Sequence, residues 1–531
     1  MTHSDITPLN PLTLTPSGST PSDDPSSITG YVDEARRAQG VWAAQTLQAR
    51  ADRLIALAKL ITERREEGVQ IIHEETGRPR SVAALSEVNN VLAFAQAAIK
   101  EARVALRPNK VGLSPVDFPG KSAVVEQVPR GVVGIIAPWN YPVSNFYKSL
   151  FPALLAGNAV ILKPSELTPR SGAWLASLAQ ETLGEGLVTC VQGGGDIGAA
   201  LIDAGIDAVV FTGSVATGER VAAAAAKRLI PCSLELGGKD AALVLADADL
   251  ERTALGIAQW SLFNSGQDCS SIERLFVVEE IAEPLLERLT GIYQALRVAD
   301  QTDDSEADLG PLQSEAQLRL VERQVRDAVE AGAQLRCGGE ATGSGYGYLP
   351  TILDRCDPSL DVMTEESFGP ILAVARVKDA AEGVELINRS SYGLNGSVWT
   401  KDLKRGAAIA RQLEVGVALV NNHSFTGSLP QTPWTGVKST GYGVASSRWS
   451  YHTFARPRTV VIDKNTKPDP FWIPVDQSYR EFVEAVARKN LGGGIGVLFK
   501  LIGLLGKRIK VIKQLAQARP TSRDGSSESR S

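Results

Sequence analysis

Between Gly131 and Glu235 the chain alternates short β-branched runs with longer segments typical of helices. The β-branched runs occupy residues 132–137, 159–162, 188–191 and 208–211, and helix-forming segments such as 171–183 separate them. This alternation predicts right-handed βαβ units, which build a parallel sheet covered by helices on both faces. We therefore expect an α/β fold in which this region is a candidate for nucleotide binding.

Helical periodicity precedes this region, and a second mixed α/β region follows it. Apolar residues recur at three-to-four spacing over 32–42, 54–61 and 82–92, which predicts amphipathic helices. From about 236 to 424, strand-like runs alternate again with helical ones. A chain of 531 residues exceeds one hydrophobic core, so two or three domains are expected.

The net charge and the cysteine content indicate which class of protein and which cellular compartment to expect. The net charge of −5 argues against a general nucleic-acid binder, which normally carries a concentrated basic face. The five cysteines are an odd number without a pairwise framework, and such usage suits a reducing cytoplasm. Residues 1–28 are rich in Ser, Thr, Pro and Asp, without the basic start and apolar core of a secretory signal. We predict a disordered leader there and a cytoplasmic protein.

Three segments carry residues suited to carbonyl chemistry. Cys269 closes the run Phe-Asn-Ser-Gly-Gln-Asp-Cys, and Glu235 stands in Leu-Glu-Leu-Gly-Gly-Lys. Asn140 lies in Pro-Trp-Asn-Tyr-Pro, directly after the first strand-like run. A thiol, a carboxylate and an amide in glycine- or proline-shaped turns are what carbonyl oxidation through a covalent thioester requires.

Together these segments resemble the aldehyde dehydrogenase superfamily, over about residues 29–463. The resemblance implies a Rossmann-like NAD(P)-binding domain at 29–235, with an oligomerisation hairpin at about 108–128. It implies an α/β catalytic domain at 236–424, and a return segment with an oligomerisation strand at 425–463. Members of this superfamily assemble, so we expect a homodimer or a homotetramer.

The resemblance also implies the catalytic roles. Cys269 would attack the aldehyde as a thiolate. The side-chain amide of Asn140 and the backbone N–H of Cys269 would stabilise the oxyanion of the adduct. Glu235 would act as the general base that activates water, with a pKa raised by partial desolvation. The other four cysteines are expected to be inert apolar residues.

Further motifs indicate a site for NAD, with NADP as a second possibility. In the family, residues matching Lys163 and Glu166 contact the adenosine ribose, and a carboxylate there would repel the 2′-phosphate of NADP. The glycine turn before a helix at 213–218 would place backbone amides at the pyrophosphate. The residue matching Glu366 holds the nicotinamide ribose, and Phe368 would pack beside the ring. The full set of cofactor candidates is Trp139, Lys163, Ser165, Glu166, Gly213, Ser214, Gly218, Leu236, Glu366 and Phe368.

No metal site is expected, because the four histidines are scattered and lack ligand spacing to the cysteines. His423 could line a substrate pocket, but a hydrogen bond within a loop is the favoured interpretation.

The chain departs from the family next to the nucleophile and near residue 434. Asp268 should oppose thiolate formation and repel anionic substrates unless a cation offsets it, and Arg274 is the candidate partner. Trp434 and Thr435 replace the usual Phe and Gly of a late glycine-rich turn. These changes leave the expected mechanism intact. They leave the substrate undetermined.

Three alternatives to general aldehyde oxidation stay open. A succinate-semialdehyde dehydrogenase would need a cationic clamp for the second carboxylate. A non-catalytic nucleotide-binding scaffold of the same fold is disfavoured by the intact Cys269, Glu235 and Asn140. Acylating members that use coenzyme A typically lack the equivalent of Glu235.

The C-terminal extension at 464–531 is the largest departure. Its segment 491–515 combines apolar residues at helical spacing with interspersed Lys and Arg, and no acid occurs between Glu484 and Asp524. The apolar stretch is too short and too charged to span a bilayer, but a basic amphipathic segment suits an anionic membrane surface. The alternative is a helix packed on a neighbouring subunit, although its glycines weaken any helix. Residues 519–531 are expected to be disordered.

Overall fold

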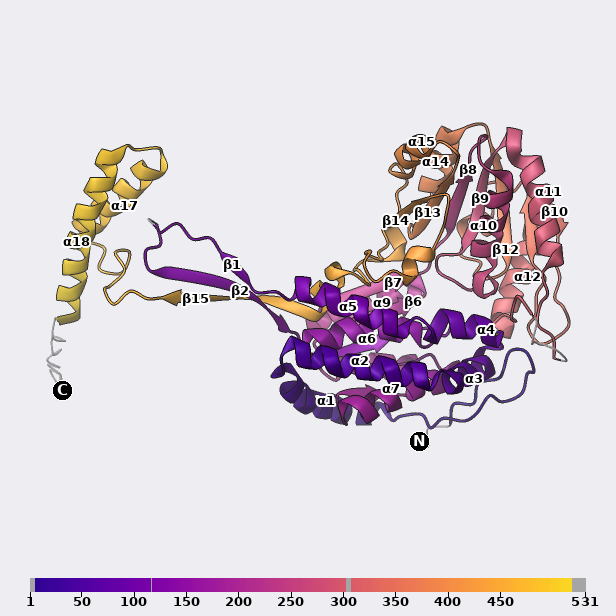
Figure 1. The fold of residues 1–531 in the computed structure, drawn as a ribbon, viewed down its shortest axis with the longest axis horizontal. Helices are drawn as coiled ribbons and strands as arrows, with labels where there is room; N and C mark the ends of the chain where they lie inside the picture. The colour runs from indigo at the N-terminus through magenta and orange to yellow at the C-terminus, as the bar shows by residue number, and fades with distance from the viewer. Residues whose placement is uncertain (1–4, 116, 302–306, 518–531) are drawn as a thin grey trace, which may run out of the picture. The chain divides into compact units, whose positions relative to one another are not determined.

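A computed structural model of the chain describes residues 5–115, 117–301 and 307–517 (Figure 1). The chain divides into two compact units. The first comprises Met1–Arg107 and Gln127–Arg458, and the second comprises Pro108–Glu126 and Thr459–Ser531. The described residues form three sheets, and the two larger ones belong to α/β layers, as predicted.

The first sheet is five-stranded and parallel, in the order β5-β4-β3-β6-β7. Its strands are β3 (Val132–Ile136), β4 (Ala159–Lys163), β5 (Val188–Cys190), β6 (Ala208–Gly213) and β7 (Cys232–Leu236). Because β3 lies between β4 and β6, the loops that follow these three strands meet at one edge of the sheet. Ligands of open α/β sheets bind at this carboxyl edge.

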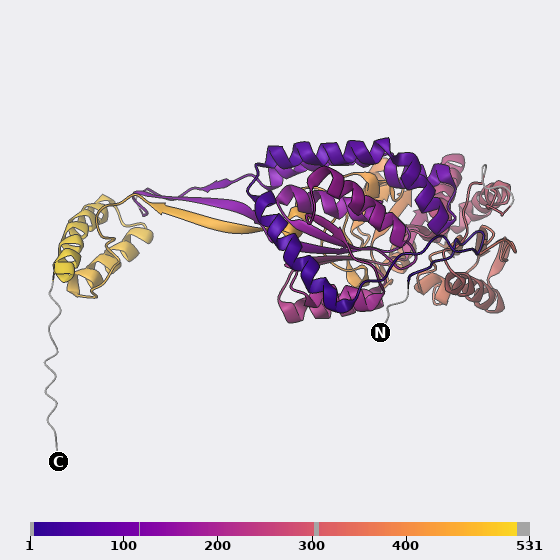
Figure 2. The ribbon, with the colours of Figure 1, turned by 90° about the horizontal axis from the view of Figure 1, so that it is seen from below.

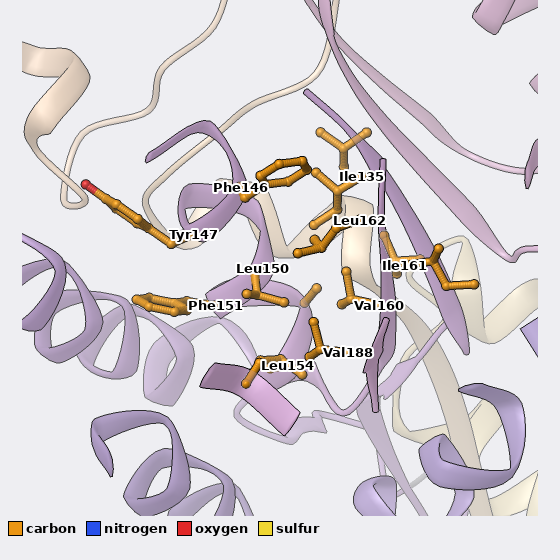
Figure 3. Close-up of a cluster of buried hydrophobic side chains, with 14 of the residues drawn as sticks. Ile135, Phe146, Tyr147, Leu150, Phe151, Leu154, Val160, Ile161, Leu162 and Val188 are labelled. Carbon is orange, nitrogen blue, oxygen red and sulfur yellow. The ribbon is translucent and has the colours of Figure 1, made fainter. Parts of the chain in front are cut away.

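Helix α6 (Ser144–Ala156) covers part of this sheet and contributes much of its core. Figure 3 shows Phe146, Leu150 and Leu154 of the helix beside Val160 and Leu162 of β4. All five side chains are buried, and each contributes about 1.5–3 kcal/mol to folding. This packing fixes the position of the loop 138–143, which joins β3 to α6.

Further helices flank the same sheet. They are α1 (Ile28–Ala43), α2 (Leu47–Glu63), α3 (Arg65–Thr76), α4 (Arg80–Ala83), α5 (Val91–Ala105), α7 (Pro169–Leu183), α8 (Gly195–Asp203) and α9 (Val215–Arg228). Helices α2 and α5 lie side by side (Figure 1). The helix predicted over 82–92 is interrupted by a π-helical turn at Ala84–Val88.

Within the described residues, one helical run, Arg80–Ala105, is long and apolar enough to cross a membrane. Its Val91, Phe94 and Ala98 are buried in the core of the first sheet, as expected for a core helix.

The second sheet has the order β10-β11-β12-β9-β8-β13-β14. Its strands are β8 (Asp240–Val244), β9 (Ile272–Val278), β10 (Gln334–Cys337), β11 (Thr351–Asp354), β12 (Ile371–Val377), β13 (Asn395–Trp399) and β14 (Val417–Val420). All neighbours are parallel except β10 and β11, which are antiparallel. The principal helices here are α10 (Leu250–Leu262), α11 (Glu279–Ala295), α12 (Glu315–Glu330), α14 (Ala380–Asn388) and α15 (Leu403–Ala410). Both large sheets belong to the first compact unit. Because this division does not separate them, a domain boundary at Glu235 stays a prediction.

The prediction of a disordered leader at 1–28 was wrong for residues 5–28. Leu12 and Ile28 are buried, and isolated bridges pair Ile6 with Thr20. The Asp23 carboxylate accepts a hydrogen bond of 2.6 Å from the backbone N–H of Gln192. A segment poor in apolar residues is thus held mainly by backbone and polar contacts, which composition does not reveal.

The third sheet has the order β1-β2-β15, with strands β1 (Asn109–Val111), β2 (Lys121–Pro129) and β15 (Ala455–Asp463). β1 and β2 form the antiparallel hairpin predicted at about 108–128, and β15 runs beside β2 (Figure 2). Lys121 makes ion pairs with Asp463 at 2.9 Å and Asp469 at 2.8 Å.

Two helices, α17 (Gln477–Asn490) and α18 (Ile495–Gln517), follow the sheet. They share a small core of Phe482, Ala485 and Leu504. The predicted basic amphipathic segment is therefore helical despite its glycines. The prediction of disorder at 519–531 lies outside the described residues.

Candidate active site

A cavity of about 470 Å³ opens beside the carboxyl edge of the first sheet. Asn140, Glu235 and Cys269 all line it. They come from three separate parts of the sequence, and the structure brings all three to one cavity. The segment around each of these three residues determines how its side chain is oriented.

The loop before Cys269 is held in an uncommon backbone conformation. Asn264 and Ser265 both have left-handed φ values, of 54° and 58°. The side-chain amide of Gln267 donates to the carbonyl of Pro311 at 3.1 Å, and its oxygen accepts from the N–H of Gln313 at 2.8 Å. These contacts hold the strained turn in place, and so they fix the position of the sulfur.

Asn140 is oriented from both ends of its amide. Its Nδ2 donates to the carbonyl of Gln267 at 3.2 Å, and its Oδ1 accepts from Nδ2 of Asn145 at 3.3 Å. The amide nitrogen carries two donor hydrogens, and the bond to Gln267 uses one of them. A second donor therefore remains in the cavity wall that also contains Cys269.

A buried ion pair supports the Asn140 loop, and sequence reasoning missed it. Nη1 of Arg78 lies 3.0 Å from Oε1 of Glu87, and Nη2 of Arg78 donates to the carbonyl of Asn140. The other Glu87 oxygen accepts from the N–H of Ser144 at 2.7 Å. Arg78 also lies over the Tyr141 ring, 5.3 Å from its centre. A lone Arg or Glu is usually a surface residue, so composition offered no signal.

Glu235 lies near the end of β7 and is partly exposed to the cavity. Burial raises its pKa to about 7, and the positive charge of Lys148 opposes this rise. The following turn has no room for a side chain, because a Cβ at Gly238 would collide with the carbonyl oxygen of Cys269. Glycine at position 238 thus lets the segment after Glu235 approach the nucleophile loop.

Burial raises the pKa of the Cys269 thiol well above its usual value, and the charges of Asp268 and Asp240 raise it further. The expected pairing of Asp268 with Arg274 is wrong. Asp268 instead accepts from the hydroxyl of Tyr141 at 2.6 Å and from the N–H of Ser270 at 2.8 Å. Arg274 donates to the carbonyl of Lys239 at 2.8 Å.

The candidates for the adenosine half of the cofactor lie at the same sheet edge. Lys163 ends β4, with its Nζ 3.8 Å from Glu166, and the Ser165 hydroxyl accepts from the N–H of Leu167 at 3.2 Å. Gly213 ends β6, and Ser214 caps the N-terminus of α9. A Cβ at Gly218 would lie 2.5 Å from a methyl group of Leu236, so only glycine lets this helix approach the strand. Free backbone amides at such a terminus suit a pyrophosphate.

The candidates for the nicotinamide half line the cavity itself. Oε1 of Glu366 accepts from the N–H of Gly238 at 2.9 Å, and burial raises the Glu366 pKa to about 8. The Trp139 and Phe368 rings meet edge-to-face, with centres 5.5 Å apart and planes at 88°. The residues present therefore fit a dinucleotide. Six predicted residues line the cavity, namely Trp139, Gly213, Ser214, Leu236, Glu366 and Phe368, whereas Lys163, Ser165, Glu166 and Gly218 lie outside its lining.

The remaining wall combines polar side chains with a set of apolar and aromatic ones. The apolar and aromatic set includes Leu85, Tyr141, Trp260, Phe263, Phe425 and Trp434. Trp434 was noted in the sequence, but Trp260 and Phe425 were not, because isolated aromatics are more often core residues. Lys148, eight residues after Asn140 on α6, was also missed, and it is the one basic side chain among the described lining residues.

His423 is buried and lies outside the cavity lining, and its Nδ1 lies 2.9 Å from the hydroxyl of Ser397 on β13, so its hydrogen bond runs to a strand and not within a loop. Burial lowers its pKa to about 3. In the described part of the chain, no group of three His, Cys, Asp or Glu side chains is placed to hold a metal. The five cysteines, all described, are free thiols.

A family model, described as "Aldehyde dehydrogenase family", matches residues 2–460. The chain belongs to the aldehyde dehydrogenase family. It is an NAD(P)-dependent oxidoreductase that acts on aldehydes. The chain is 37% identical over 480 residues to the 4,4'-diapolycopene aldehyde oxidase of a Methylomonas species, which covers 90% of each protein. It is 34% identical over 472 residues to a Mycobacterium tuberculosis protein named provisionally as an NADP-dependent succinate-semialdehyde dehydrogenase, covering 87% of this chain and 89% of that one.

Solved structures of aldehyde dehydrogenases share this fold. An aldehyde dehydrogenase of Mycobacterium tuberculosis in complex with NAD+ superimposes with a TM-score of 0.82 at 31% identity, covering 87% of this chain and 96% of that one. The NADP-dependent glyceraldehyde-3-phosphate dehydrogenase of Bacillus halodurans, in complex with NADP, gives 0.80 at 36% identity, with the same coverage. Both nicotinamide cofactors thus occur among close structural relatives.

Proposed function

We propose that the enzyme oxidises a neutral, apolar aldehyde to the carboxylic acid, with Cys269 as the nucleophile. The thiol proton passes to water, and the sulfur then adds to the carbonyl carbon to form a thiohemiacetal. Bound NAD(P)+ supplies the hydride acceptor for this chemistry. Loss of hydride from the thiohemiacetal leaves an acyl thioester on Cys269.

Asn140 would stabilise the oxyanion that develops when the sulfur adds. Its Oδ1 is engaged by Asn145, so the amide nitrogen is the end that faces the reaction. The Arg78–Glu87 pair supports its backbone. A preorganised donor of this kind is worth about 3 kcal/mol in the transition state.

Glu235 would then accept a proton from water, and the water oxygen would attack the thioester. The carbon–sulfur bond breaks, the carboxylic acid leaves, and the Cys269 thiolate is released. A pKa of about 7 is well matched to this task, because both protonation states are accessible near neutral pH.

One observation carries the choice of an apolar substrate. The wall beside Cys269 combines aromatic and aliphatic side chains with neutral Ser, Asn and Gln side chains. Its ionisable acids are Asp268, Glu235 and Glu366, and its one cation is Lys148. Because burial raises the Glu366 pKa to about 8, the carboxylates that oppose an anionic aldehyde are those of Asp268 and Glu235, against the one ammonium of Lys148. The name of the Methylomonas relative, which refers to a diapolycopene aldehyde, supports the same class.

The second candidate is a semialdehyde, because Lys148 could pair with its carboxylate. The name of the Mycobacterium tuberculosis relative favours this reading. The test compares kcat/KM for long-chain aldehydes and for succinic semialdehyde, in the wild type and in Lys148→Met. We expect the long-chain aldehyde to be preferred by the wild type and to remain a good substrate in Lys148→Met. A preference for succinic semialdehyde that Lys148→Met abolishes would establish the second candidate instead.

The assembly proposed for this enzyme is a homodimer or a homotetramer. Val461 and Ile462 of β15 are 58% and 55% exposed in the single chain, which suits burial by a second copy. Light scattering coupled to size exclusion measures the subunit number. The five free thiols fit a reducing cytoplasm.

For the C-terminal extension, residues 464–531, called the tail below, we propose contact with an anionic membrane surface. Ile495, Phe499 and Ile502 occupy one face of α18 and are 75%, 70% and 61% exposed. The opposite face is anchored, because Arg508 pairs with Asp476 at 2.8 Å. Lys510 and Lys513 are exposed on the same helix, which carries no acid. Exposed apolar residues with flanking cations are typical of helices that lie in a lipid interface.

A further inference from the structure

A buried ion pair lies close to the cavity and takes no part in the proposed reaction. Lys239, between β7 and β8, places its Nζ 2.5 Å from Oε2 of Glu273 on β9. The two side chains are 0% and 3% exposed. Buried charges are costly unless they are paired and fully hydrogen-bonded, so the remaining contacts of this pair indicate what it holds.

Those contacts converge on the segment 366–368, which includes two of the cofactor candidates. Oε2 of Glu273 accepts from the N–H of Ser367 and Oε1 accepts from the N–H of Phe368, both at 2.8 Å. Nζ of Lys239 also donates to the Ser367 hydroxyl at 2.8 Å. The pair therefore binds Ser367 and Phe368, the two residues that directly follow Glu366, through hydrogen bonds.

The segment needs this support to keep its shape. Phe368 has a φ of 50°, in the left-handed region that L-residues avoid. Nε2 of Gln317 donates to the carbonyls of Ser367 and Phe368, at 2.7 and 3.1 Å. The segment is thus held through its N–H groups by Glu273 and through its carbonyls by Gln317.

We propose that Glu273, with Lys239 as its counter-ion, is a positioning residue for cofactor binding. It holds Glu366 against the Gly238 N–H and holds the Phe368 ring edge-on to Trp139. These two side chains would contact the nicotinamide ribose and ring. The inference rests on the cofactor roles proposed for Glu366 and Phe368. It predicts that loss of the Glu273 carboxylate weakens cofactor binding without disabling the thiol.

The test is Glu273→Gln, which preserves the size of the side chain and one acceptor oxygen but removes the charge. We expect KM for NAD+ to rise about tenfold or more, as for loss of hydrogen bonds to a charged group. Hydrolysis of p-nitrophenyl acetate without cofactor, which needs the thiol and no hydride acceptor, should change by no more than about twofold. Gln317→Ala, which releases the same segment from its carbonyl side without a buried charge, should raise KM in the same direction.

Two comparisons separate this inference from the proposed function. If Glu366→Ala and Phe368→Ala leave KM for NAD+ unchanged, the cofactor roles themselves are wrong. If these two variants raise KM but folded Glu273→Gln does not, the positioning role alone is overturned. Should Glu273→Gln not fold, the double variant Lys239→Met/Glu273→Gln, which leaves no unpaired charge, decides by the same readouts. A lower melting temperature with an unchanged KM would show a purely structural role and overturn the inference.

Discussion

The Tyr141 hydroxyl donates a hydrogen bond of 2.6 Å to Oδ2 of Asp268. This bond joins the loop that carries Asn140 to the loop that carries Cys269. Burial and the charge of Asp268 raise the Tyr141 pKa well above its usual value, so the phenol remains a neutral donor. An acid next to the nucleophile is therefore a structural tie as well as a source of negative charge.

The first prediction concerns the charge of Asp268. Asp268→Asn should lower the pKa of the Cys269 thiol, because Asp268 is the foremost charge that raises it. The rate of iodoacetamide alkylation, measured against pH, should therefore reach its midpoint at lower pH. Tyr141→Phe is the control, since it removes the hydrogen bond and keeps the carboxylate. An Asp268→Asn profile that coincides with the wild type would contradict the prediction.

The second prediction concerns the nucleophile. Cys269→Ala should reduce aldehyde oxidation about 1,000-fold or more, because the covalent route is lost. Cys232→Ser is the matched control and should retain activity, since Cys232 lies outside the lining of the cavity and burial raises its pKa to about 11. The absorbance of the reduced nicotinamide measures the activity of both variants. Substantial oxidation by Cys269→Ala would overturn the mechanism.

The third prediction concerns the base. Glu235→Gln should still form about one equivalent of NADH per site in a first turnover and then stall, because the thioester is no longer hydrolysed. Stopped-flow fluorescence measures this burst. Wild-type hydrolysis should increase as pH rises through about 7, since only the carboxylate form of Glu235 accepts the proton. A Glu235→Gln variant with undiminished steady-state turnover would exclude Glu235 as the base.

The Glu235 pKa also has a consequence for stability. Because the folded pKa is raised, the unfolded chain loses this proton first, and the wild type should lose stability as pH rises from about 4.5 to about 7. The difference in melting temperature between Glu235→Gln and the wild type should therefore shift in favour of the variant over this window. A difference that does not vary with pH would argue against a buried, titrating carboxylate.

The fourth prediction concerns the tail. Full-length enzyme should co-sediment with vesicles containing about 30% phosphatidylserine, and raised salt should weaken this binding. A truncation ending at Asn490 should not bind. The charge-reversed Lys510→Glu/Lys513→Glu, which alters exposed positions of α18, should bind less. Equal binding by all three proteins would end the membrane proposal, and a changed subunit number on truncation would favour packing against a neighbouring subunit.

Local patterns were enough to predict much of this fold. The strands β3, β4, β5 and β6 fall where β-branched runs predicted them, because parallel buried strands are nearly continuous apolar segments. The catalytic motifs were found through their resemblance to the aldehyde dehydrogenase superfamily, in segments that glycine and proline shape into turns. Three residues far apart in the sequence could thus be assigned to one site before any coordinates were known.

Contacts made across the tertiary structure could not be predicted in this way. Arg274 was expected to balance Asp268, but on β9 it donates instead to Lys239. The pair Lys239–Glu273 joins two segments whose proximity depends on strand order. Arg78 and Glu87 are only nine residues apart, but their burial against the Asn140 loop depends on tertiary packing. Lys148 faces the cavity only because α6 packs on β3 and β4 with its apolar side. Burial of single charges is a property of topology, and composition does not encode it.

The turn at Gly238, which has no space for a Cβ beside the Cys269 carbonyl, restricts how this enzyme could be redesigned. Mutant libraries aimed at new substrates should spare that turn and randomise the aromatic wall at Trp260, Phe425 and Trp434. Replacing these aromatic residues by alanine would enlarge the cavity, while the sulfur of Cys269 keeps its position relative to Glu235. Duplicated genes would diversify in the same way, because changes in the aromatic wall alter the substrate range while the reaction chemistry is retained.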